Sequence, residues 1–277
     1  MASFVHHTTR DLITVSGPDA GAYLQGQLSQ DVARLAVGDA ALTFVLAPQG
    51  KVEGWGRVHR AEADRFVIDA DPGAGESWTT RLRRFLLRTN AEVELAEQVT
   101  TTSVRGSETG PAPEGALEAH WPGTEGWDLI GDPAEARAPE GATEIGAEAF
   151  TALRIRAGVP RWGTEIDADT IPATLGQWLI DASVSFTKGC YTGQELVARI
   201  DSRGGNVPRR LAGAVVEGDP IPVGSEVRVG EASSLVTSSA SGGERSVALL
   251  FLPRSVETPA DGEADGRPIR LVDLPMA

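Results

Sequence analysis

The stretch that decides the fold is SFTKGCYTGQELVARIDSRGG, residues 185–205, which carries the single cysteine of the chain, Cys190. Within it, Thr192 and Glu195 have the spacing of a capping box, in which each side chain bonds the backbone of the other residue. The sequence therefore predicts a helix that begins at Thr192, ends before Gly204 and follows a short strand. Cys190 would lie in the connection between the strand and the helix.

The residues alone leave two interpretations of Cys190 open. The positive end of a helix and the nearby cation of Lys188 would favour a thiolate, and Gly189 and Gly193 would let a ligand approach the backbone closely. Free cysteine is also among the most buried residue types, so a small apolar filler is equally expected. One thiol cannot hold an iron–sulfur cluster, which takes about four protein ligands, so any cluster contact would be shared with a partner.

The composition is that of an acidic globular chain. It has 277 residues, with 25 Lys and Arg against 39 Asp and Glu and a net charge of −14. This length predicts two or three domains, and the charge disfavours nucleic acid as a direct partner. The apolar runs are strand-sized, no secretory signal is apparent, and a single cysteine suits a reducing compartment. We therefore expect a cytoplasmic protein without a membrane segment.

Strand and helix patterns divide the chain into two parts. LITVSG at 12–17 predicts a strand that leads into a helix, and 41–69 predicts an antiparallel meander with turns at PQG and EAD. Helical spacing follows residue 75 and recurs before Gly158. After residue 205, short strands separated by Gly, Pro, Asp and Ser predict a small β-barrel. Residues 105–145 are loop-like except for GWDLIG.

Three segments resemble one known family. They are KGCYTGQE at 188–195, ITVSGPDAGAYLQGQLSQDV at 13–32 and AFTALRIRAGVPRWGTEI at 149–166. These segments are similar to signatures of the YgfZ family. The proteins of this family are relatives of the glycine-cleavage T-protein. The matching T-protein loop lacks the cysteine, so Cys190 favours the YgfZ branch.

The resemblance implies an α+β, T-protein-like fold around a central ligand hole. Two intertwined α+β domains would be formed by residues 1–45 with 146–205 and by residues 46–145, and a C-terminal β-barrel by residues 206–277. It also implies tetrahydrofolate or a derivative as the ligand. The implied function is that of a folate-binding accessory protein for iron–sulfur cluster assembly or repair, which supports iron–sulfur enzymes such as tRNA-modifying ones. Its partners would be iron–sulfur client proteins, and we expect a monomer. The alternative is a folate-dependent aminomethyltransferase.

Eight residues are the predicted site residues. Cys190 and Lys188 are assigned to the reactive loop, and folate binding is assigned to Phe150, Arg156, Gln25, Gln27, Tyr191 and Gln194. Phe150 stands where some relatives have tryptophan, and Arg156 stands where the family often has glutamate. For Gln25 and Gln27, the alternative is the end of a helix with Gly26 as its cap.

Other candidate groups are weaker. The four histidines lack metal-site spacing, so no metal site is expected, and no Walker A sequence is present. Carboxylates that could act in catalysis are suggested only by their positions at strand ends, namely Asp69, Asp71 and Glu53. Three arginines, Arg203, Arg209 and Arg210, could meet the glutamate tail of a folate.

Overall fold

The long first strand, β1 (Ser3–Ser16), is the centre of the main sheet. This computed structural model describes residues 3–107, 109–131 and 139–276. β1 pairs antiparallel with β5 (Glu92–Gly106) along nearly its whole length and with β4 (Arg65–Ala70) over its second half. The sheet is eight-stranded, and its remaining strands are β2 (Ala40–Leu46), β3 (Val52–Glu62), β6 (Leu117–Glu118), β7 (Glu125–Ile130) and β8 (Thr143–Glu144). The order is β2-β3-β4-β1-β5-β7-β6, with β8 added parallel to β1.

Helices cover both faces of this sheet. On one face, Leu24 of α1 (Ala20–Gln27) and Trp78 of α2 (Gly75–Arg84) pack in a cluster that includes Val45 of β2. The neighbouring Phe44 belongs to a second cluster, because successive side chains of a strand point to opposite faces. That second cluster contains residues of α4 (Gln177–Ser183), α5 (Gln194–Asp201) and the 3₁₀ helix η3 (Pro172–Leu175); a further 3₁₀ helix, η1, spans Val32–Arg34.

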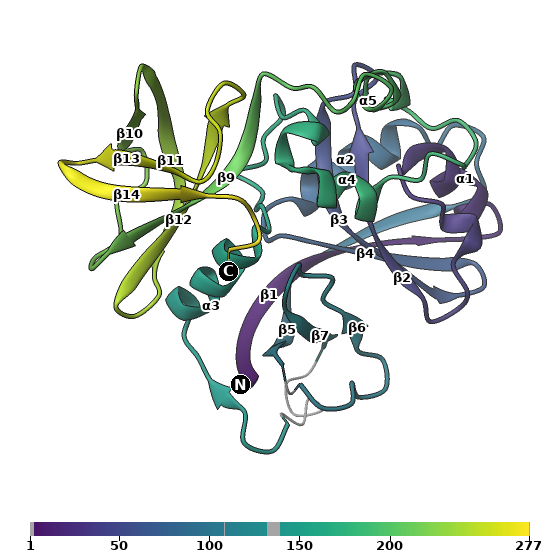
Figure 1. The fold of residues 1–277 in the computed structure, drawn as a ribbon. Helices are drawn as coiled ribbons and strands as arrows, with labels where there is room; N and C mark the ends of the chain where they lie inside the picture. Colours follow the sequence, from purple (N-terminus) through teal and green to yellow (C-terminus); the bar gives the residue numbers. More distant parts are fainter. Residues whose placement is uncertain (1–2, 108, 132–138, 277) are drawn as a thin grey trace.

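The C-terminal strands close into a six-stranded barrel, seen at the left of Figure 1. Its strands are β9 (Arg209–Glu217), β10 (Glu226–Val229), β11 (Ala232–Ser241), β12 (Arg245–Pro253), β13 (Ala260–Ala264) and β14 (Arg267–Val272). Leu250 of β12 lies in the barrel core, whereas its neighbour Leu249 faces outward. The outward face packs on Ile155 of α3 (Ala147–Ala157), which lies between barrel and sheet.

The structure confirms the α+β class, the meander formed by β2, β3 and β4, and the C-terminal barrel. It also confirms that α3 ends at Gly158, which has φ of 73°. A Cβ at this position would lie 2.8 Å from Leu274 Cβ, so both the conformation and the space require glycine. The sheet contains β1 and β2 together with β3 to β7, and the proposed division into two N-terminal domains stays a prediction.

The local structure around Cys190 differs from expectation. No strand precedes the loop, which instead follows α4, and α5 begins at Gln194 without a side-chain cap. The predicted capping box is therefore wrong. Gly193 occupies the N-cap position with φ of 82°, and a Cβ there would lie 2.4 Å from the Ala47 carbonyl oxygen. Close packing on β2 thus sets the start of α5, and Glu195 pairs with Arg199 instead.

The helical spacing that follows residue 75 is confirmed by α2, which ends at Arg84. Among the residues that the structure describes, no helix is both long and apolar enough to cross a membrane.

Candidate functional site

A cavity of about 210 Å³ lies between the first half of β1 and α3. Residues from β1, β3, β5, β7, α3 and the segment after α3 line it. The lining includes His6, Arg10, Trp55, Arg57, Asp69, Asp71, Ser103, Arg105, Trp121, Asp128, Phe150, Arg154 and Arg161.

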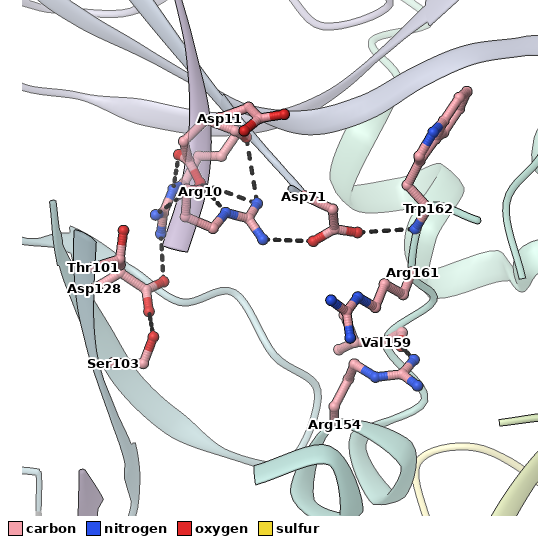
Figure 2. A network of polar contacts seen from close by, with 12 residues as sticks. Arg10, Asp11, Asp71, Thr101, Ser103, Asp128, Arg154, Val159, Arg161 and Trp162 are labelled. Atoms are coloured by element: carbon pink, nitrogen blue, oxygen red, sulfur yellow. Dashed lines mark hydrogen bonds and ion pairs between the residues drawn. The ribbon is translucent and has the colours of Figure 1, made fainter. Parts of the chain in front are cut away.

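One side of the cavity carries an ion pair between two strands. Arg10 of β1 contacts Asp71 at 2.6 Å and Asp69 at 3.1 Å. The second oxygen of Asp71 accepts a hydrogen bond from the backbone N–H of Trp162 at 2.9 Å (Figure 2). Burial by itself lowers the pKa of Arg10, but the two carboxylates outweigh burial and raise it. Asp71 therefore ties the end of β4 both to β1 and to the segment that follows α3.

The ion pairs continue across the sheet beneath the cavity. Arg57 of β3 contacts Asp69 at 2.9 Å and Asp128 of β7 at 3.1 Å. Asp128 also contacts Arg105 at 2.8 Å and accepts a hydrogen bond from Ser103 at 2.6 Å. We call the alternating series Asp71–Arg10–Asp69–Arg57–Asp128–Arg105 the ion chain. Its members compensate one another, so that these buried charges are paired.

Burial and pairing act in opposite directions on these groups. Burial by itself raises the pKa of the Asp128 carboxyl, but Arg105 and Arg57 outweigh it and hold the pKa well below its usual value. Burial by itself lowers the pKa of Arg57, but Asp69 and Asp128 outweigh it and raise the pKa. For Arg105 burial prevails over Asp128, and its pKa is lowered.

An aromatic wall faces the ion chain. The ring of Phe150 on α3 stacks on His6 with centroids 4.5 Å apart, and lies 5.2 Å from Trp121. The Arg105 guanidinium lies over the Trp121 ring at 4.3 Å. Trp55 adds a further indole, whose N–H donates to the Ser183 hydroxyl at 3.0 Å. The cavity therefore combines flat apolar surfaces with a charged floor.

Two arginines complete the lining on the side of α3. Arg154 is buried and donates to the Val159 carbonyl at 2.7 Å and to Glu165 at 3.1 Å. Arg161 is exposed, and its backbone N–H donates to Glu165 at 3.1 Å. Within the described parts of the chain, no hydrogen bond or ion pair of the Arg161 guanidinium is found.

The two predicted folate residues on α3, Phe150 and Arg156, lie on different faces of the helix. Ala147, Phe150, Thr151 and Arg154 line the cavity at helical spacing. Arg156 is not among the described residues that line it. A Cβ added to Gly242, in the turn after β11, would lie 2.6 Å from Arg156 Nη2, which places Arg156 beside the barrel.

The predicted glutamines also lie outside the cavity lining. Gln25 donates to Asp31 at 2.9 Å, and Gln27 accepts from Arg81 at 3.0 Å. α1 ends at Gln27 and is followed by Leu28, so Gly26 is not its cap.

The remaining four predicted residues are close in sequence and lie in the loop before α5 and at the first residue of α5, Gln194. Lys188 donates to the backbone carbonyls of Leu28 and Gln30, each at 2.7 Å, and burial lowers its pKa to about 8. The Lys188 ammonium therefore holds the loop against the residues that directly follow α1. Cys190 beside it is exposed.

The two other predicted residues are Tyr191 in the loop and Gln194 at the start of α5. Tyr191 is buried, which raises its pKa to about 12, and the side chain of Gln194 accepts from its backbone N–H at 3.2 Å. This loop and the cavity share no lining residue in the described part of the chain. Cys190 therefore lies outside the cavity that Phe150 lines.

Sequence reasoning missed most of the ion chain. Its signal was present as charged residues inside apolar strands, such as Arg57 in VEGWGRVH and Asp128 in GWDLI. A charge in a strand that is otherwise apolar needs a partner, because an unpaired buried charge is costly. Of the three suggested carboxylates, Asp69 and Asp71 line the cavity. Glu53 does not line it and forms an ion pair with Arg81, with 2.7 Å between the charged atoms. No group of three or more potential metal ligands is found among residues 3–107, 109–131 and 139–276.

The fold has a closed C-terminal barrel beside a mixed sheet, with the cavity between that sheet and α3, and it is of the T-protein class. A solved structure of the glycine cleavage system aminomethyltransferase T from Bartonella henselae is similar, with a TM-score of 0.78 and 18% identity. The match covers 100% of this chain and 86% of that one. No family model matches the sequence.

Comparison with sequence relatives identifies the family within this fold class. An uncharacterized protein of Haemophilus influenzae is 30% identical over 231 residues, which are 83% of this chain and 79% of that protein. The tRNA-modifying protein YgfZ of Photorhabdus laumondii is 29% identical and that of Enterobacter sp. 30%, each over 70% of this chain. This chain belongs to the YgfZ family. It spans 65% and 66% of the length of those two YgfZ relatives, just under two thirds.

Proposed function

We propose that this chain is a folate-binding accessory protein that supports iron–sulfur cluster assembly or repair in enzymes that modify tRNA. The observation that carries the folate part is the cavity, which sets an aromatic wall against a charged floor. The tRNA part is supported by the name of the relatives, tRNA-modifying protein YgfZ. We further propose that the protein acts in the cytoplasm as a monomer with iron–sulfur client proteins as partners.

The cavity residues fit the chemistry of a folate. A folate has a flat pterin, whose edge presents both donors and acceptors, and an acidic tail. Phe150 and Trp121 offer ring faces for stacking, and the Ser103 hydroxyl oxygen, whose proton is donated to Asp128, offers an acceptor at the floor. A bound tetrahydrofolate would supply one-carbon chemistry. The protein residues would orient the ring and exclude water from it. The other predicted folate residues, Arg156, Gln25, Gln27, Tyr191 and Gln194, would then act only through the surrounding structure.

Cys190 is proposed as the reactive thiol of this function. It is exposed, and Lys188 fastens its loop to the end of α1. An exposed thiol on a fastened loop is accessible to a partner protein. Because a single cysteine provides only one of about four cluster ligands, the proposed contact with a cluster is shared with a client.

The second candidate is aminomethyl transfer to a folate. It needs a group in the cavity that can exchange a proton with the substrate. The cavity-lining carboxylates of the described residues, Asp69, Asp71 and Asp128, are each paired with an arginine. Paired carboxylates are less suited to proton exchange than free ones, which favours the accessory role.

The ligand is tested by anaerobic calorimetry with tetrahydrofolate on the parent protein and two variants. Trp121→Leu, which removes a cavity ring, should weaken binding by about tenfold, since stacking of one ring on another contributes roughly 1 kcal/mol or more. Phe251→Leu changes a ring of the barrel and should bind like the parent. Absence of binding heat in the parent would refute the folate proposal.

The cellular role is tested in cells that lack the protein. The readout is the abundance of tRNA nucleosides that iron–sulfur enzymes modify, measured by mass spectrometry. Restoration by the parent and by Gly189→Ala, but not by Cys190→Ala, is the expected result. Full restoration by Cys190→Ala would refute the role of the thiol, and unchanged tRNA in the deletion cells would refute the accessory role.

A further inference from the structure

The cavity lining has more positive than negative side chains. Five arginines line it, against three aspartates: Arg10, Arg57, Arg105, Arg154, Arg161, and Asp69, Asp71, Asp128. This excess lies in a chain whose net charge is −14. A cationic concavity in a protein of opposite charge concentrates anionic ligands there.

Four of these five arginines form ion pairs with acidic side chains. The three arginines of the ion chain pair with the three aspartates, and Arg154 pairs with Glu165, whose carboxylate is fully buried. Arg161 is left without such a partner among the described residues. Both oxygens of the nearby Asp71 are engaged by Arg10 and by the Trp162 N–H.

The backbone holds Arg161 at the cavity while its side chain stays available. Its N–H donates to Glu165 at 3.1 Å, and its carbonyl accepts from the backbone N–H groups of Glu165 and Ile166, both at 3.1 Å. The next residue, Trp162, is tied to Asp71. Figure 2 shows the Arg161 side chain extending from this segment into the space between Asp71 and Arg154. The main chain therefore fixes where the Arg161 side chain begins, and no side-chain partner holds its guanidinium among the described residues.

We infer that Arg161 is a specificity-determining residue that binds a carboxylate of the ligand in this cavity. A guanidinium presents five N–H donors in a planar fork that matches a carboxylate with two parallel hydrogen bonds. The inference rests on the proposed function, in which the ligand is a folate and the carboxylates belong to its glutamate tail. The pterin then lies toward the aromatic wall, and the tail lies toward the segment after α3.

The arginines that the sequence suggested for the tail are placed elsewhere. Arg209 lies over the Phe251 ring at 4.8 Å, and Arg210 donates to the Val256 carbonyl at 2.9 Å. Neither of them lines the cavity, nor does Arg203, among the residues that the structure describes. Arg161 takes the role that was considered for them.

The test compares two ligands of nearly equal size. One is tetrahydrofolate, and the other is tetrahydrofolate with both tail carboxylates converted to primary amides. Calorimetry measures both on the parent, Arg161→Gln and Arg161→Lys. The control is Arg199→Gln, which removes the same charge from the exposed face of α5.

A charge-assisted pair of hydrogen bonds predicts that the parent binds the acid roughly tenfold or more tighter than the diamide. Arg161→Gln should lose this preference through weaker binding of the acid, with the diamide unchanged within about twofold. Arg161→Lys should keep part of the preference, because it keeps the charge without the fork. The control should behave like the parent.

Equal affinity of the parent for acid and diamide would overturn the inference while the folate proposal stands. An Arg161→Gln variant that still prefers the acid as the parent does would overturn it as well. If the parent binds neither ligand, the folate proposal fails and the inference fails with it. Because the Arg161 backbone carries its hydrogen bonds, both variants should melt at the temperature of the parent.

Discussion

The carboxylate of Glu165 lies 2.6 Å from the Ser238 hydroxyl, which joins the segment after α3 to strand β11 of the barrel. The same carboxylate accepts from Thr237 at 2.7 Å and from Arg154 at 3.1 Å. It is fully buried, and Arg154 lines the cavity. One buried charge therefore connects the barrel to a wall of the candidate site.

Replacing Glu165 with glutamine should destabilise the protein strongly. The change leaves the buried Arg154 without its counter-charge, and breaking one side of a buried pair costs about 3–5 kcal/mol. Urea unfolding measures the loss. The matched control is Glu148→Gln, an exposed residue of α3 that should change the unfolding free energy by less than about 0.5 kcal/mol. Equal stability of the two variants would contradict the assignment.

Asp128 should make the protein sensitive to acid. Its folded-state pKa lies well below the ordinary value of 3.8, so the unfolded chain takes up the proton first as the pH falls. The stabilisation is complete above about pH 4 and decreases below it. Thermal melts between pH 5 and pH 3 should fall more steeply for the parent than for Asp128→Asn. A variant with the parent's slope would show that Asp128 does not contribute; Asp261→Asn, on the barrel surface, is the control.

Two glycines of the reactive loop should respond differently to alanine. Gly193 has φ of 82°, and a Cβ there would lie 2.4 Å from the Ala47 carbonyl oxygen. Gly189, four residues earlier, has no heavy atom within 4 Å of an added Cβ. Gly193→Ala should lose about 1–3 kcal/mol of unfolding free energy, whereas Gly189→Ala should lose little. Comparable losses in urea unfolding would argue against the packing of this loop on β2.

Lys188 should titrate near pH 8. The chain has only two lysines, Lys51 and Lys188, so lysine side chains labelled with carbon-13 give two assignable signals, with Lys51→Arg as the assignment control. Burial lowers the pKa of Lys188 to about 8, below its ordinary value of 10.5. The unfolded chain holds this proton more tightly, so the contribution of Lys188 to stability rises between about pH 8 and 10.5. A Lys188 midpoint above pH 10 would contradict the observed burial.

The elements whose bounds are set by residues adjacent in the sequence could be predicted from the sequence. The barrel strands and the β2–β4 meander are bounded by turn residues, and Gly158 marks the end of α3. The ion chain depends instead on strand register. Arg57 lies directly opposite Asp69 in the β3–β4 ladder, and a shift of one residue would move one of them to the other face.

The same limit applies to the loop that carries Cys190. Its signature identified the family, yet the partners of Lys188 are carbonyls at Leu28 and Gln30, 160 and 158 positions away. Such a contact has no local pattern. For that reason the sequence suggested an ammonium acting on the thiol, whereas the structure places the ammonium on the backbone of another segment.

The central position of β1 also matters while the chain is being made. On the ribosome, β1 is synthesised before β4 and β5, which pair with its two edges. Until Glu92 and the residues after it emerge, one edge of a 14-residue strand has no permanent neighbour. Unpaired strand edges promote association between chains. The nascent chain therefore passes through a stage in which this edge of β1 is open to pairing with other chains, and the cavity can form only after α3 and Arg161 have been added.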